Sequence, residues 1–78
     1  MFIYHAVSNE VGTVLAVYGE ALLSEAQEKA RSIQASTGEK TYLHSVAVAD
    51  YHARPRVGQS ISMLGFHRDG NKFLISLQ

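Results

Sequence analysis

The chain has 78 residues, of which 46% are hydrophobic and 18% charged, and its formal net charge is zero. This length predicts one domain, residues 1–78, with a thin core, because so short a chain buries only about 60% of its unfolded surface. The absence of cysteine excludes disulfides, thiolate zinc sites and cysteine nucleophiles. With no signal peptide and no apolar run of about 20 residues, the sequence predicts a soluble, cytoplasmic protein without a membrane span.

The first predicted elements are two strands joined as a hairpin. Residues 2–7 and 13–18 are rich in β-branched and aromatic side chains, and residues 8–12 between them have turn composition.

A helix of about 13 residues is predicted next. Ser24 is placed as its N-cap, with a glutamine three residues later that completes a capping box. Ala26, Ala30 and Ile33 recur at helical spacing on the predicted buried side. Gly38 is suited to the left-handed conformation that often ends a helix.

The region after the helix predicts three more strands. Residues 41–49 alternate large and small side chains, and the small face offers a close seat for the helix alanines. Pro55 excludes residues 50–56 from a central strand. Residues 59–66 and 72–77 flank an Asp-Gly pair, which is a strong signal for a two-residue hairpin turn.

The predicted fold class is therefore α+β. We expect an antiparallel sheet of about five strands with one helix packed on one face, in the order β-β-α-β-β-β. Because residues 13–18 and 41–49 are apolar on both sides, one helix leaves an apolar sheet face uncovered. Sheet curvature, self-association or a protein partner would each shield that face.

Signatures of catalysis and metal binding are missing from the sequence. The four histidines do not follow a metal-ligand spacing, and no serine lies in a G-x-S-x-G motif. No glycine-rich loop with a phosphate-binding pattern is present. We therefore predict no enzyme activity, metal or cofactor, and we interpret His5 and His44 as partly buried strand residues with hydrogen-bonding neighbours.

The zero net charge hides an uneven distribution of charge. Residues 1–50 carry three positive and six negative side chains, whereas residues 51–78 carry four positive and one negative. Such a separation can steer an acidic partner without making the whole chain basic. The structural alternative is a solvated loop whose arginines pair locally with Asp50 or with glutamates.

Two late segments place these cations beside aromatic rings. Residues 50–56 combine a tyrosine and a histidine with two arginines, and residues 67–72 form the tip of the last predicted hairpin. Cations among rings suit phosphate contacts with base stacking, or an acidic protein groove with aromatic sockets. Four cations would give only weak salt dependence on nucleic acid, which favours a protein or protein–RNA complex over free duplex DNA. The predicted partner-binding residues are Tyr51, His52, Arg54, Arg56, Arg68 and Lys72, with Arg31 and Lys40 extending the face.

Two stretches, residues 23–33 (LSEAQEKARSI) and 64–73 (LGFHRDGNKF), supply a capped helix after the first hairpin and a basic, aromatic closing hairpin. With the order of elements, they resemble the small phage-encoded anti-CRISPR proteins built from one helix on a five-stranded antiparallel sheet, especially those acting on type I surveillance (Cascade) complexes. The resemblance implies a non-enzymatic inhibitor that docks on the Cascade protein surface in the host cytoplasm and blocks target DNA binding or hybridisation. It implies no shared binding motif, so the candidate residues rest on charge alone.

The sequence leaves two rival hypotheses open. One is a small nucleic-acid-binding module that acts alone and makes weak contacts with RNA or DNA. The other is a structural homodimer whose interface would bury the uncovered sheet face, so both monomer and homodimer remain alternatives.

Overall fold

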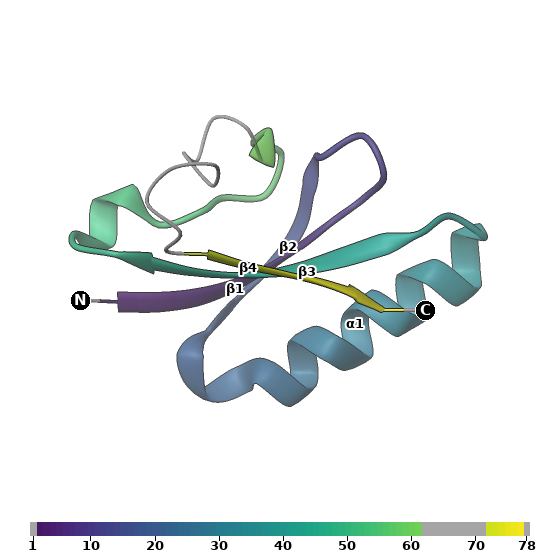
Figure 1. Ribbon diagram of the computed structural model, residues 1–78, viewed down its shortest axis with the longest axis horizontal. Coiled ribbons are helices and arrows are strands. Elements are labelled where there is room, and N and C mark those ends of the chain that lie inside the picture. The colour runs from purple at the N-terminus through teal and green to yellow at the C-terminus, as the bar shows by residue number, and fades with distance from the viewer. Residues whose placement is uncertain (1, 62–71, 78) are drawn as a thin grey trace.

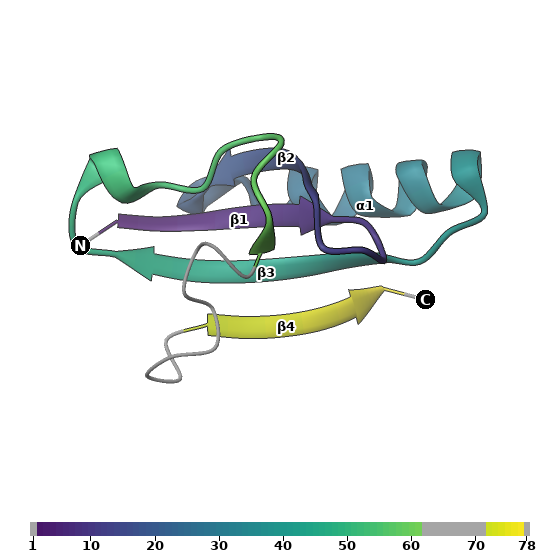
Figure 2. The same ribbon diagram turned by 90° about the horizontal axis from the view of Figure 1, so that it is seen from above.

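The computed structural model describes residues 2–61 and the backbone of residues 72–77. One helix lies on one side of an open antiparallel sheet, which confirms the α+β class (Figure 1). The strands lie in the order β2-β1-β3-β4 (Figure 2). Their bounds are β1 Phe2–Ser8, β2 Val14–Gly19, β3 Thr41–Val48 and β4 Lys72–Leu77. The helix α1 covers Leu23–Thr37, and two 3₁₀ turns, η1 and η2, cover Glu20–Leu22 and Tyr51–Ala53.

The five predicted strands are not confirmed. Of the strand expected at residues 59–66, residues 59–61 form only an isolated bridge, in which Ser60 pairs with Thr13. Residues 62–66 and the predicted Asp-Gly turn lie outside the described residues. The N–H of Gln59 donates to the carbonyl of Arg56 at 3.1 Å, so a tight turn brings residues 58–61 to the start of β2.

The prediction of Ser24 as the N-cap is wrong. The 3₁₀ turn η1 runs directly into α1, which begins at Leu23 without a side-chain cap. Since an N-cap residue needs non-helical backbone angles, Ser24 inside the first turn cannot serve as one. The predicted end is confirmed, because Gly38 adopts φ 77° and its N–H donates to the carbonyl of Gln34 at 2.9 Å.

The helix packs closely on the sheet through its alanines. Ala26 and Ala30 are fully buried and share a core cluster with Val7 of β1 and Leu43 of β3. Short side chains let the two backbones approach, which confirms the seat predicted on the small face of β3. The hydroxyl of Thr41, itself buried, donates to the carbonyl of Ala30 at 2.8 Å.

This hydrogen bond gives a testable prediction for stability. Thr41→Val keeps the shape of the side chain but loses the buried bond, so we expect the free energy of unfolding to fall by about 1 kcal/mol. Thr37→Val is the matched control, because the Thr37 hydroxyl donates to the carbonyl of Ile33 at 2.9 Å at an exposed site where water can replace it. We expect a loss of about 0.5 kcal/mol or less there. Urea denaturation followed by circular dichroism measures both, and equal losses would contradict the argument.

The other face of the sheet is covered in part by the chain itself. Residues 51–61 lie on the side opposite α1 (Figure 1), and Pro55 is fully buried there. A second core cluster on this side joins Ile61 to buried residues of the first three strands: Ala6, Val14 and Val46. Residues 51–61 therefore cover part of the sheet face opposite α1. From the sequence we had considered sheet curvature, self-association or a protein partner as the shield of that face.

A β-bulge changes which residues of β2 share a face. The register shifts between Val7 and Ser8, so that Val14 joins Val17 on the loop side, while Ala16 and Tyr18 pack on the helix side. Strict alternation along residues 13–18 would place Val14 with Ala16 and Tyr18, but a bulge sets two residues of one strand opposite one of the other and so changes the face of Val14.

Two buried histidines connect neighbouring strands, as predicted for His5 and His44. The Nδ1 atom of His5 lies 2.9 Å from the Ser45 hydroxyl, and its Nε2 lies 3.0 Å from the carbonyl of Glu20. The Ser8 hydroxyl lies 2.8 Å from Nε2 of His44. Ser8 is only 1% exposed, so the pair is a cross-strand contact rather than an accessible nucleophile with its base.

Candidate binding groove

The segment after β3 is shaped by its own polar groups. The carboxylate of Asp50 accepts a hydrogen bond from the backbone N–H of His52 at 3.0 Å, and the Asp50 carbonyl accepts one from Ala53 at 2.9 Å. Such Asx capping is the usual role of an aspartate that starts a turn. The carboxylate of Asp50 is therefore used for the backbone of η2.

Tyr51 lies at the centre of a small aromatic and cationic cluster. The guanidinium of Arg54 sits 4.0 Å from the centroid of the Tyr51 ring and donates to the Tyr51 carbonyl at 3.3 Å. The ring also meets Phe2 of β1 and His52 in edge contacts, with centroids 6.2 and 6.1 Å apart. A cation–π contact of this kind stabilises a partly exposed site by about 0.5–1 kcal/mol. The cluster therefore fixes the position of Arg54.

The two arginines are separated by a proline that is anchored in the structure. Pro55 is fully buried and holds the segment against the sheet. The backbone N–H of Arg56 donates to Oε1 of Gln59 at 2.8 Å. Arg56 itself is exposed, so its backbone is fixed while its guanidinium faces solvent.

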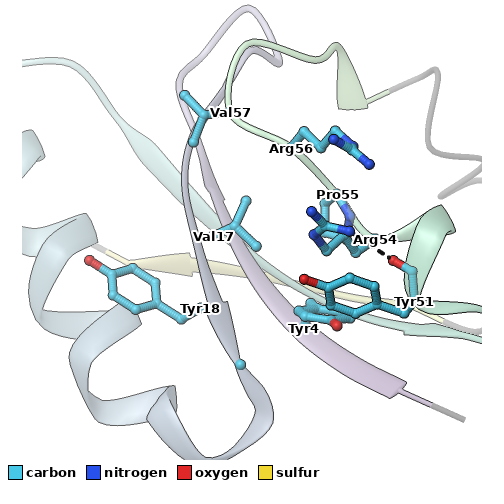
Figure 3. A pocket seen from close by; sticks show the side chains of 9 residues that line it. Tyr4, Val17, Tyr18, Tyr51, Arg54, Pro55, Arg56 and Val57 are labelled. Carbon is cyan, nitrogen blue, oxygen red and sulfur yellow. Dashed lines mark hydrogen bonds between the residues drawn. The ribbon is translucent and has the colours of Figure 1, made fainter.

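Residues 51–57, together with β1 and β2, line an open groove of about 380 Å³ (Figure 3). Tyr4 in the first half of β1, residues 17–19 at the end of β2, and residues 51–57 after β3 contribute its lining. In Figure 3 Arg54 lies over Tyr51, while the ring of Tyr18 points away toward the helix. The lining residues are Tyr4, Val17, Tyr18, Gly19, Tyr51, Arg54, Pro55, Arg56 and Val57.

The charged side chains described in the groove are all positive. Among the described residues that line it are two arginines and no acidic residue. Within residues 2–61, neither Arg54 nor Arg56 forms an ion pair; the pair seen there joins Arg31 to Glu28 at 3.5 Å on the exposed side of α1. The local pairing with Asp50 or glutamates that we considered from the sequence is therefore not present in this part of the chain.

The structure brings together only some of the predicted partner-binding residues. Arg54 and Arg56 line the groove with Tyr51, and His52 contacts the Tyr51 ring. The backbone of Lys72 pairs with Val46 of β3, on the side of the sheet away from β2. Arg68 lies outside the described residues.

The structure does not bring Arg31 and Lys40, the two residues expected to extend this face, to the groove. Arg31 lies on α1, on the opposite side of the sheet from residues 51–61 (Figure 1). Lys40 precedes β3 and η2 follows it, so the whole length of that strand separates Lys40 from the groove. Both had been assigned by charge and proximity to the helix end, which do not specify a sheet face.

Sequence reasoning missed the apolar half of the groove. Tyr4, Val17 and Val57 line it, and Val57 is 66% exposed. Period-two alternation puts Tyr4 on the same face as Phe2 and Ala6, which was a usable signal. The position of Val57 over the end of β2 depends on the turn after Arg56, which we did not predict.

No family model, no curated protein and no solved structure matches this chain. In the described part of the chain, no helix is long and apolar enough to cross a membrane. Over the same residues, no three histidine, aspartate or glutamate side chains gather in a way that could hold a metal ion.

Proposed function

We propose that the chain is a non-enzymatic binding module that docks on an acidic surface of a partner protein through the groove. The observation that carries the proposal is the presence of two guanidiniums, Arg54 and Arg56, with no ion-pair partner in residues 2–61. The guanidinium of Arg54 is already held against the Tyr51 ring, so it loses little entropy when it binds a carboxylate, and the planar fork of either arginine matches that group.

The ring contacts favour a protein partner over a nucleic acid. Arg54 covers one face of the Tyr51 ring at 4.0 Å, and Phe2 and His52 contact its edges. Tyr51 is 49% exposed, but one of the two ring faces on which a base could stack is already occupied by Arg54. The groove instead offers a cationic wall beside apolar side chains, an arrangement typical of protein interfaces with arginine and tyrosine at their centre.

The more specific proposal is an anti-CRISPR-like inhibitor that binds a type I Cascade complex and blocks target DNA binding or hybridisation. It is supported by the resemblance in element order, of which the first hairpin, the helix and β3 lie within the described residues. On this proposal, residues Tyr51, His52, Arg54 and Arg56 contact the protein surface of the complex.

Binding assays with defined partners test the proposal. Biolayer interferometry measures the chain against purified type I Cascade complexes, and fluorescence anisotropy measures it against single-stranded RNA and DNA at about 50 and about 200 mM salt. We expect binding to a Cascade complex and no salt-sensitive binding to either nucleic acid alone. Tight, salt-sensitive binding to free RNA or DNA would support the independent nucleic-acid module instead, and failure to bind any type I complex would contradict the inhibitor proposal.

A further inference from the structure

The outer edge of β2 is open next to the groove. β2 is an edge strand of the sheet. In the described part of the chain, Val14 is the residue of β2 whose backbone forms hydrogen bonds on the outer side of the strand. The Val14 N–H donates to the carbonyl of Gln59, and its carbonyl accepts from Gly58, both at 2.9 Å. From residue 15 to Gly19 the outward backbone groups have no partner in the described part of the chain.

The conformation of residues 55–58 explains why the chain pairs with Val14 and with no later residue of β2 in the described part of the structure. Residues 57 and 58 form a turn, in which Gly58 has φ 94°. Pro55, two residues before that turn, has no N–H to donate to a strand. The chain therefore pairs with the first residue of β2 and then crosses to the loop face, which leaves the rest of the edge unpaired.

The two faces beside the open edge differ in chemistry. On the loop side, the end of β2 adjoins Arg54 and Arg56 across the groove, whereas on the helix side it presents Ala16 and Tyr18. Successive side chains of a strand added to this edge would point alternately to the two sides. The matching segment would therefore alternate acidic and apolar residues.

We infer that the outer edge of β2, from residue 15 to Gly19, accepts an extended segment of the partner protein as an added antiparallel strand, with its acidic side chains against Arg54 and Arg56. This inference rests on the proposed function and specifies how the partner is bound. Strand addition gives affinity through main-chain hydrogen bonds and specificity through alternate side chains. A second copy of the chain is disfavoured as the occupant, because its own β2, Val14–Gly19, carries no acidic side chain to face Arg54 and Arg56.

A peptide probe tests the inference on the full chain. The probe is a fluorescein-labelled heptapeptide, Glu-Val-Glu-Val-Glu-Val-Glu, with two controls that carry N-methyl groups on every valine amide or on every internal glutamate amide. Because alternate amides of a strand point to the same edge, only one control blocks the paired edge. We expect that control to bind at least about tenfold more weakly than the parent and the other control to bind about as well as the parent. Hydrogen exchange should show new protection between residues 15 and 19.

The outcomes separate strand addition from the groove itself. If both methylated peptides bind as well as the parent while the double variant Arg54→Glu/Arg56→Glu loses binding, the cationic groove stands as the binding site and strand addition is overturned. If that variant binds the parent peptide normally, the groove is not the binding site and the proposed function fails as well. No binding of the parent peptide by the wild-type chain would also overturn strand addition.

Discussion

Leu43→Ala should produce the largest loss of stability among single truncations in the helix-side core. Leu43 is fully buried among Val7, Ala26 and Ala30. Its neighbours include two alanines, whose short side chains cannot reach across to fill the space left by the leucine. We expect the free energy of unfolding to fall by about 2–5 kcal/mol. For a domain of this size the total is about 4–12 kcal/mol, so the variant should be partly unfolded or melt at least about 10 °C lower.

Leu22→Ala is the matched control, because it removes the same atoms from a leucine that is 42% exposed. We expect a loss of less than about 1 kcal/mol there. Thermal and urea denaturation followed by circular dichroism measure both variants. Similar losses at the two leucines would contradict the assignment of residues 23–37 and β3 to one tightly packed core.

The double variant Arg54→Glu/Arg56→Glu should show the largest effect on binding. Both guanidiniums line the groove, and neither is used in an ion pair within residues 2–61. Reversing both charges replaces attraction to a carboxylate by repulsion. Since close charge pairs at interfaces couple by about 1.5–7 kcal/mol, we expect affinity for the Glu/Val heptapeptide to fall at least about 100-fold.

The matched control is Arg31→Glu/Lys40→Glu, which changes the net charge by the same amount on surfaces away from the groove. Its only described ion pair is the exposed contact of Arg31 with Glu28, so its fold should be little affected. We expect its affinity to change less than about threefold, the part that long-range steering can supply. Fluorescence anisotropy measures both, and equal losses would show that total charge rather than the groove governs binding.

Local chemistry in the sequence predicted much of the fold. The first hairpin, the helix end at Gly38 and the small face of β3 follow from side-chain patterns within a few residues of each other. The errors arose where neighbouring segments override local signals. Ser24 is absorbed into a helix that η1 had already started, and the bulge that moves Val14 to the loop side depends on the pairing of β1 with β2.

The candidate site was predictable only in part for the same reason. Tyr51, Arg54 and Arg56 are close in sequence, so their clustering follows from the Asx turn and the proline. The apolar wall that Val17 and Val57 add depends on a turn that carries the chain over β2. Charge composition alone carried no information about sheet faces, which is why Arg31 and Lys40 were grouped with residues that lie elsewhere in the fold.

The most direct test of the central claim is whether reversing the charges at Arg54 and Arg56 also reverses the preference of the chain for acidic over basic peptides. The wild-type chain and the Arg54→Glu/Arg56→Glu variant are each titrated with the Glu/Val heptapeptide and with a Lys/Val heptapeptide of the same length. If Arg54 and Arg56 form the recognition surface, the wild-type chain prefers the acidic peptide and the variant prefers the basic one. A variant that keeps the wild-type preference for the acidic peptide would contradict the assignment of this groove as the binding site.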